Sequence, residues 1–220
     1  MIAPIFRQAS ISAHSVNEIG AILKDTFSVL AGGLLGAAAV FPELLGILED
    51  VCVMAGRTEA CDSPRRVAII GSGPAGLAAA SVLRRKGHSV DVFEAAPVVG
   101  FTFLNAPALE SSSDAPEAFA PASAETLEAA VVFLERAGIS FRTSCPKGQT
   151  ELEAMLSEYD AVICACGKAA VLPTDAMGCV KGNLYAAGTC VKNQKVLSAV
   201  QAAESGRKTA GSVCTMLAAK

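Results

Sequence analysis

Residues 66–94 read RVAIIGSGPAGLAAASVLRRKGHSVDVFE, and this stretch decides the predicted fold. Val67 to Ile70 form a short, β-branched and apolar run, which is typical of a strand buried on both faces. Gly71, Gly73 and Gly76 follow in the spacing G-x-G-x-x-G. In a strand–turn–helix unit the first glycine permits the tight turn, the second lets a pyrophosphate approach the backbone, and the third lets the helix pack against the strand.

The residues after the glycines predict a helix and a second strand. Leu77 to Arg85 is rich in alanine and ends in cations before Gly87, which is the expected helix stop. Ser89 to Phe93 predicts the strand, which closes at Glu94, 23 residues after Gly71. A carboxylate there can accept the hydroxyl hydrogens of an adenosine ribose and repels a 2′-phosphate, so NADP is disfavoured in this site. An α/β turn without a ligand is the less favoured alternative.

The composition bounds the class of protein. The 220 residues are 52% hydrophobic and only 18% charged, which predicts a surface buried against a partner. The net charge of −3 and the absence of a basic run argue against a nucleic-acid ligand. We predict a helical N-terminal interaction segment over residues 1–62 and a nucleotide-binding domain over residues 63–220, because residues 56–64 have the composition of a linker.

The eight cysteines predict reduced, mostly structural thiols in a cytoplasmic protein, because residues 1–15 lack a signal-peptide pattern and no C-x-x-C pair occurs. We therefore expect no metal site in the chain alone; a cluster would need ligands from a partner chain. Cys164-x-Cys166 suggests a redox dithiol, but we expect its side chains to point to opposite faces of a strand and favour a structural role. Cys190 could approach a cofactor, although packing is favoured. His14 and His88 are expected to be solvated.

Residues 16–54 predict an apolar helical hairpin with Pro42 in the first turn of its second helix. The uncharged run 26–41 has sixteen residues, and a membrane span needs about 20. A hairpin buried against protein is therefore favoured, and contact with a membrane is the less favoured alternative.

The remaining elements follow from periodicity and from turn residues. An apolar loop (101–107) and a flexible surface segment (110–121) are expected first. Helices are predicted over residues 123–137, 150–157 and 197–218, and strands over 139–143, 160–166 and 183–187. Thr150 and Glu153 suggest a capping box. The last helix carries an apolar stripe of Val200, Ala203, Ala210 and Val213, and its positive end would stabilise negative charge on a flavin ring beside residues 196–200.

Six motifs occur in a fixed order: VAIIGSGPAGLAAA with GHSVDVFE, VGFTFLNAP, ERAGISFRTSCPKG, EYDAVICACG, GNLYAAGTC and VLSAVQAAESGRKTA. In these motifs the chain resembles the FAD domain of the pyridine-nucleotide-disulfide-reductase-like flavoproteins, most closely the glutamate synthase small-subunit group. The resemblance implies an α/β, Rossmann-like FAD-binding domain of the glutathione-reductase type, with a parallel sheet and helices, preceded here by the small α-helical hairpin. It implies FAD contacts at Gly71, Ser72, Gly73, Pro74, Ala75, Gly76, Glu94, Ala95, Gly100, Phe101, Cys145, Ala165, Cys166, Gly167, Gly188, Thr189, Leu197, Ala199 and Val200.

The chain departs from the family pattern in several places. Only fourteen residues separate Gly167 from Gly182, where the family holds a second nucleotide domain, so the NAD(P)H domain is expected to be absent. The iron–sulfur segment that precedes the FAD motif in the group is also missing. Thr189 replaces the acid of the G-G-D motif, Phe103 replaces an arginine, and Val99 replaces a glycine. Because the carboxylate at Thr189 and the guanidinium at Phe103 are lost, we expect weaker binding of a flavin than in the family.

These features favour an FAD-binding electron-transfer subunit of a multi-subunit oxidoreductase. Its flavin would exchange electrons with an iron–sulfur cluster or a second flavin in another subunit, and the chain would not be active alone. No side chain stands out as a catalytic acid, base or nucleophile. A degenerate FAD-fold subunit with a structural role is the main alternative. A simple NAD-dependent dehydrogenase ranks last, because a catalytic acid–base candidate and the remaining strands of a six-stranded nucleotide fold are missing.

Overall fold

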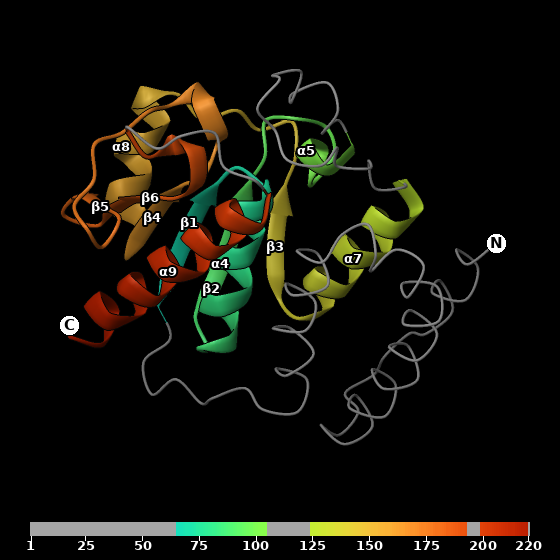
Figure 1. The fold of residues 1–220 in the computed structure, drawn as a ribbon. Coiled ribbons are helices and arrows are strands. Elements are labelled where there is room, and N and C mark those ends of the chain that lie inside the picture. Colours follow the sequence, from blue (N-terminus) through green and yellow to red (C-terminus); the bar gives the residue numbers. More distant parts are fainter. Residues whose placement is uncertain (1–64, 105–123, 193–198, 220) are drawn as a thin grey trace.

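A six-stranded sheet organises the chain, and β1 lies inside it. In the computed structural model, residues 65–104, 124–192 and 199–219 are described. The strand order is β3-β2-β1-β4-β6-β5, and every neighbouring pair is parallel except β5 and β6 (Figure 1). The strands are β1 (Arg66–Ile70), β2 (Ser89–Phe93), β3 (Ile139–Arg142), β4 (Ala161–Cys164), β5 (Cys179–Lys181) and β6 (Leu184–Ala186).

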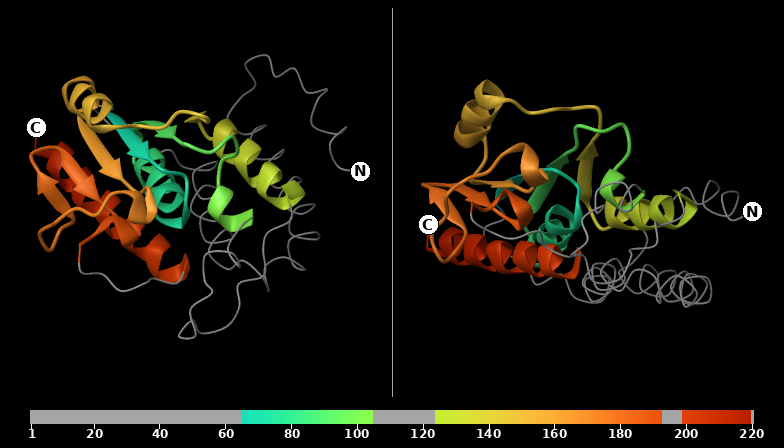
Figure 2. Two further views of the ribbon diagram at one scale, coloured as in Figure 1. Left: turned by 90° about the horizontal axis from the view of Figure 1, so that it is seen from above. Right: turned by 45° about the horizontal axis from the view of Figure 1, so that its top comes forward.

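Helices cover both faces of the sheet. The longer ones are α4 (Pro74–Arg85), α7 (Ala124–Arg136), α8 (Gln149–Glu158) and α9 (Ala199–Ala218); α5 (Phe101–Leu104) and the 3₁₀ turns η1 (Gly167–Ala169) and η2 (Gly188–Cys190) are short. Val67 and Ile69 of β1 face a core formed with α4, α7 and α9, whereas Ala68 and Ile70 face a second core with α8. Figure 2 shows the resulting arrangement, with α8 across the sheet from α9.

Helices α4 and α9 lie against each other at very short range. A Cβ atom added at Gly206 would lie 2.0 Å from the carbonyl oxygen of Ala75, so only glycine fits at this crossing. Ala203, Ala210 and Val213 are fully buried on the same side of α9. This packing fixes the start of α9 next to the start of α4, where the glycine turn lies.

The predicted fold class is confirmed, since the sheet is dominated by parallel strands. The predicted strand Ser89–Phe93 matches β2, and the predicted helix 123–137 matches α7 within one residue at each end. Two elements were missed. Residues 101–104 form the single turn α5 where a loop was expected, and β5 adds a sixth, antiparallel strand. The expectation that a sixth strand is missing was therefore wrong, although this strand is antiparallel to its neighbour.

Three local expectations were wrong. Helix α8 begins at Gln149, and the Glu151 carboxylate accepts the N–H of Gly148 at 3.0 Å, so Thr150 is not its cap. Val200, which was placed in the apolar stripe of α9, is 51% exposed and so does not share the fully buried face of Ala203 and Ala210. His88 is 5% exposed rather than solvated, and its Nδ1 accepts the backbone N–H of Arg65.

The predicted hairpin (16–54), the boundary at residues 62 and 63, and the surface segment 110–121 lie outside the described residues. Among the residues that the structure describes, no helix combines the length and the hydropathy needed to cross a bilayer.

Candidate functional site

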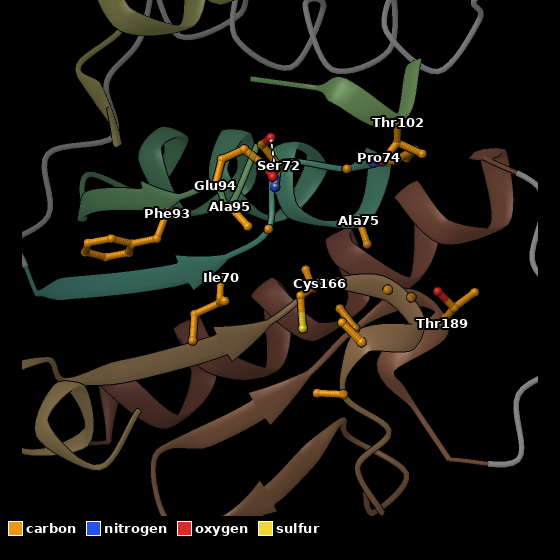
Figure 3. A pocket seen from close by; sticks show the side chains of 18 of the residues that line it. Ile70, Ser72, Pro74, Ala75, Phe93, Glu94, Ala95, Thr102, Cys166 and Thr189 are labelled. Carbon is orange, nitrogen blue, oxygen red and sulfur yellow. Dashed lines mark hydrogen bonds between the residues drawn. The ribbon is translucent and has the colours of Figure 1, made fainter. Parts of the chain in front are cut away.

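A cleft of about 410 Å³ opens at the carboxyl ends of β1, β2, β4 and β6 (Figure 3). The chain leaves β1 towards β2 on one side, whereas β4 lies on the other side of β1. Ligands of open α/β sheets bind where the direction of the strand order reverses in this way. The position of the cleft in the topology therefore identifies it as the candidate binding site.

The glycine turn after β1 forms one wall of the cleft. Gly71 has a φ of +103°, and a Cβ atom there would lie 2.5 Å from the carbonyl oxygen of Ala165. A Cβ atom at Gly76 would lie 2.0 Å from the oxygen of Gly71, which explains why α4 can start so close to the turn. At Gly73 the nearest atom to such a Cβ is the Thr102 hydroxyl oxygen at 3.6 Å, so this glycine leaves room on the cleft side.

The Glu94 carboxylate is held in place by the turn itself. The backbone N–H of Ser72 donates to Glu94 Oε2 at 2.9 Å, and the Ser72 hydroxyl donates to the same oxygen at 2.5 Å. The N–H of Ala96 donates to Oε1 at 2.8 Å. A carboxylate has about four acceptor positions. Three are used here, so Oε1 retains capacity for one further donor in the cleft. Figure 3 shows Ser72 and Glu94 pointing toward each other.

Ser72 also fixes the loop that follows β2. Its side chain is fully buried, and its Oγ accepts the N–H of Gly100 at 2.8 Å. One hydroxyl therefore connects the glycine turn, the acidic residue and the start of α5. The sequence motif leaves this position open, and only the structure shows its role.

The segment after β3 forms the outer wall. The N–H of Cys145 donates to the carbonyl oxygen of Glu94 at 2.9 Å, which brings residues 145–147 to the rim. The Lys147 ammonium lies 4.6 Å from the centroid of the Phe93 ring, in the range of a cation–π contact. The lining of this wall therefore carries a positive charge next to the Phe93 ring.

The opposite wall is formed by η1 and η2, which follow β4 and β6. The N–H of Gly188 donates to the Ser205 hydroxyl of α9 at 2.9 Å, and the N–H of Ala187 donates to the carbonyl oxygen of Cys164. A Cβ atom at Gly167 would lie 3.6 Å from the Thr189 hydroxyl oxygen. Thr189 thus lies across the cleft from Ser72 and Glu94, as Figure 3 shows.

Two thiols come together on this wall. The sulfur atoms of Cys166 and Cys190 are 3.7 Å apart, and the Cys190 thiol is 3.1 Å from the carbonyl oxygen of Gly167. The hydrogen bond from Cys190 lowers the pKa of the Cys166 thiol, although burial opposes this effect. The same hydrogen bond and burial raise the pKa of Cys190.

The pKa of Cys164 is shifted in the opposite direction from that of Cys166. Burial raises the pKa of Cys164 to about 12. The expectation that Cys164 and Cys166 point to opposite faces was wrong, because residues two apart in a strand share a face and both belong to the core beside α8. The sulfur that Cys166 contacts is nevertheless that of Cys190.

The structure brings most of the predicted cofactor residues together. The cleft is lined by Gly71, Ser72, Gly73, Pro74, Ala75, Glu94, Ala95, Cys145, Ala165, Cys166, Gly167, Gly188, Thr189 and Ala199. Gly76, Gly100, Phe101 and Val200 do not line it: Gly76 packs α4 against the turn and Gly100 bonds to Ser72. Leu197 lies outside the described residues.

Sequence reasoning missed nine lining residues: Ile70, Phe93, Thr102, Pro146, Lys147, Ala169, Ala170, Ala187 and Ala202. Seven of the nine are apolar, and three of these, Ile70, Phe93 and Ala187, stand at or directly after the carboxyl end of a strand, where the predicted parallel strands could have revealed them. Within the described ranges, no group of three or more His, Cys, Asp or Glu side chains could hold a metal ion.

Residues 65–209 match the pyridine nucleotide-disulphide oxidoreductase family. The chain belongs to this family. The match starts just before β1 and ends within α9, so the family domain includes all six strands and every wall of the cleft. The protein is therefore a member of an oxidoreductase family, and the resemblance inferred from the motifs is confirmed.

Curated relatives match this family domain in part. The glutamate synthase [NADPH] small chain of Escherichia coli is 35% identical over 106 residues, which is 47% of this chain and 20% of that protein. The flavin-containing monooxygenase FMO GS-OX-like 5 of Arabidopsis thaliana is 56% identical over 52 residues, which is 22% of this chain and 12% of that protein. This chain therefore matches only a fifth of the length of the glutamate synthase small chain and about an eighth of the length of the monooxygenase.

Among solved structures, the thioredoxin reductase of Lactococcus lactis aligns with a TM-score of 0.48 at 11% identity. The alignment covers 71% of this chain and all of that chain.

Proposed function

We propose that the cleft binds FAD and that the protein passes electrons between this flavin and a redox centre in a partner subunit. The observation that carries the proposal is the Glu94 carboxylate, which Ser72 holds at the end of β2 beside the glycine turn. A carboxylate at this position can accept a ribose hydroxyl of an adenine dinucleotide.

The other residues of the cleft fit the same ligand. Gly73 leaves open the space that a Cβ would fill, so a diphosphate can approach the backbone at the positive end of α4. Lys147 adds a cation to the rim, and the Thr189 hydroxyl can exchange one hydrogen bond with a sugar-like chain. When bound, FAD supplies the redox chemistry, and the protein sets its position and surroundings.

The partner is inferred from what the chain lacks between β4 and β6. Fourteen residues between Gly167 and Gly182 hold only η1, a short connection and β5, so a second nucleotide domain has no place there. Electrons would then come from or go to another subunit that carries an iron–sulfur cluster or a second flavin. The match to a protein named as a small chain supports a subunit role, and we place the complex in the cytoplasm.

Binding is tested by titrating the purified full-length protein with FAD and following the quenching of flavin fluorescence. We expect saturable binding of one FAD per chain and weaker binding of FMN, which lacks the adenosine that Glu94 would hold. The Gly73→Ala variant should fold normally but lose at least tenfold in affinity, or about 1.4 kcal/mol. Gly211→Ala is the matched control, because a Cβ there meets nothing within 4 Å. A folded protein that does not bind FAD would contradict the proposal.

Electron transfer needs a second measurement on the FAD-loaded protein. A reduced viologen should bleach the visible flavin absorbance, whereas NADH and NADPH should leave it unchanged. Rapid bleaching by either nicotinamide cofactor would contradict the need for a partner. Bound FAD that the viologen cannot reduce would instead favour the structural subunit, which the replacement of an acid by Thr189 suggests.

A further inference from the structure

Two sulfur atoms meet on the wall of the cleft that η1 and η2 form. Cys166 directly precedes η1, Cys190 is the last residue of η2, and their sulfur atoms are 3.7 Å apart. We propose that Cys166 and Cys190 bind a soft, monovalent metal ion, Cu(I), as a pair of thiolate ligands. This site goes beyond the proposed flavin function and does not need a bound cofactor. It differs from the expectation of no metal site in the chain alone, which considered only cysteines close together in the sequence.

The donor atoms select the kind of ion. Thiolates are soft ligands that favour Cu(I), whereas carboxylate, carbonyl and water oxygen atoms suit Mg²⁺ and Ca²⁺. Zinc sites in proteins use four protein ligands, or three and a water molecule. Among the described residues, no group of three or more His, Cys, Asp or Glu side chains could form such a set. A pair of thiolates is enough for Cu(I), because this ion is stable at low coordination numbers.

The separation of the two sulfur atoms fits a shared ion. With each sulfur about 2.3 Å from the metal, as in zinc thiolates, the 3.7 Å separation gives an S–metal–S angle of about 107°. Neither sulfur atom therefore has to move to bind the ion. A bent pair of ligands also leaves one side of the ion free for a third, small ligand from the cleft.

The exposure of the two thiols provides both an entry path and a dry side. Cys166 is half-buried and lines the cleft, so an ion can reach its sulfur atom from there. Cys190 is fully buried, and its sulfur atom contacts that of Cys166. A buried ligand keeps water away from part of the ion, which favours a weakly hydrated, soft ion over a strongly hydrated one.

The hydrogen bonds of Cys190 show what the ion would replace. The Cys190 thiol lies 3.1 Å from the carbonyl oxygen of Gly167 and 3.7 Å from the Cys166 sulfur. Metal binding requires thiolates, so the cation takes the place of the thiol protons, which are released to solvent. Neither sulfur is oxidised, and the reaction needs no oxidant or reductant.

Cys164 provides the matched control. It is buried in β4 and does not line the cleft. Cys164→Ala therefore removes a nearby thiol without removing a proposed ligand, whereas Cys166→Ala and Cys190→Ala each remove one. Circular dichroism of each variant checks that the fold is retained, and Cys190→Ser replaces Cys190→Ala if the latter does not fold.

The test offers Cu(I), as its coloured bicinchoninate complex, to the reduced full-length protein under argon and without FAD. The loss of colour measures the copper that each protein withdraws. We expect Cys166→Ala and Cys190→Ala to withdraw about one equivalent less per chain than the wild-type protein, and Cys164→Ala to withdraw as much as the wild type.

Alkylation locates the ion. Iodoacetamide is added with and without Cu(I), and the tryptic peptide 148–168, which contains Cys164 and Cys166, is fragmented and quantified by mass spectrometry. Cu(I) should slow the alkylation of Cys166 by about tenfold or more, because a thiolate bound to metal is no longer a free nucleophile. This protection should persist in Cys164→Ala and be lost in Cys190→Ala, and Zn²⁺ at the same concentration should not provide it.

Three results would overturn the proposal. The first is a wild-type protein in which Cu(I) leaves the alkylation of Cys166 unchanged, a measurement that needs no variant. The second is full protection of Cys166 in the Cys190 variant, which would make Cys166 a single ligand. The third is equal protection by Zn²⁺, which would exclude selection of a soft, monovalent ion. All these measurements are made without flavin, so a failure of FAD to bind does not alter them.

Discussion

Gly206 of α9 and Ala75 of α4 are so close that a methyl group at residue 206 would lie 2.0 Å from the Ala75 carbonyl oxygen. Ala75 is also a residue of the cleft wall, and the first turn of α9 contributes Ala199 and Ala202 to the same cleft. The glycine in α9 therefore sets both the distance between the two helices and the shape of the site.

We predict that Gly206→Ala destabilises the fold by several kcal/mol, because backbone atoms of α4 must move to admit the new methyl group. Gly211→Ala in the same helix should instead be neutral or stabilising by up to about 1 kcal/mol, since alanine has the higher helix propensity. Urea unfolding followed by circular dichroism measures both variants. Equal stability of the two variants would show that the crossing of α4 and α9 is looser than described.

Ser72→Ala should lower the free energy of unfolding by about 1–3 kcal/mol, because the buried N–H of Gly100 loses its acceptor and Glu94 loses a donor. FAD binding should weaken with it, since the Glu94 carboxylate is no longer held. Ser81→Ala is the control, because the Ser81 hydroxyl donates only to the Ala78 carbonyl oxygen inside α4. Thermal unfolding and FAD titration of both variants check the prediction. A Ser72→Ala variant with the stability and the FAD affinity of the wild-type protein would refute it.

His88 should make the fold less stable in mild acid. Burial lowers the pKa of His88 below 6.5, the Asp160 carboxylate opposes this shift, and Arg65 adds to it. The unfolded chain therefore takes up the proton more readily than the folded chain. The stability that neutral His88 contributes is complete above the unfolded pKa and is lost as the pH falls from the unfolded pKa through the folded pKa. Urea midpoints at about pH 7.5 and about pH 5.5 measure the loss. His88→Gln, whose side-chain oxygen can accept the same Arg65 N–H, should show a smaller difference; an equal difference in both proteins would rule out His88.

Alkylation of Cys166 by iodoacetamide should reach half its maximal rate at a pH below about 8.5, the value of an ordinary thiol. Cys190→Ala should move this midpoint upward, because the hydrogen bond from Cys190 is the largest cause of the lowered pKa. Cys179 is the internal reference, since burial raises its pKa and it does not line the cleft. A midpoint that does not move in Cys190→Ala would contradict the role of that hydrogen bond.

Bound FAD should slow the alkylation of Cys166 several-fold and leave that of Cys179 unchanged, since Cys166 lines the cleft and Cys179 does not. Mass spectrometry of the two peptides at several times gives both rates in one experiment. Equal protection of both thiols would indicate a general change in stability instead of occupancy of the cleft.

The sequence predicts best where each residue has one local reason for its position. Gly71, Gly73, Gly76 and Glu94 follow from the spacing of one motif, and Gly87 ends α4 with a φ of +84° as expected. Two features that the sequence reasoning missed carried local signals: Gly182-Asn183 is a hairpin signal that could have revealed β5, and Glu151 lies at the correct spacing from Gly148.

The contacts across the cleft could not be predicted, because they join residues far apart in the sequence. Nothing local marks Ser72 as the acceptor for Gly100 or Ser205 as the acceptor for Gly188. The contact between the sulfur atoms of Cys166 and Cys190 depends on the pairing of β4 with β6. The local pattern Cys164-x-Cys166 therefore could not indicate that Cys190 is the thiol next to Cys166.

The position of β1 inside the sheet bears on how the protein is made. β1 pairs with β2 across a short stretch of sequence, but Val67 meets Ala161 of β4 only 94 positions later. During synthesis the edge of β1 that pairs with β4 therefore stays unpaired until most of the domain has left the ribosome. Pairings between residues this far apart in the sequence form slowly. We expect nascent chains that stop before residue 160 to need chaperones, which arrest of translation at successive lengths would measure.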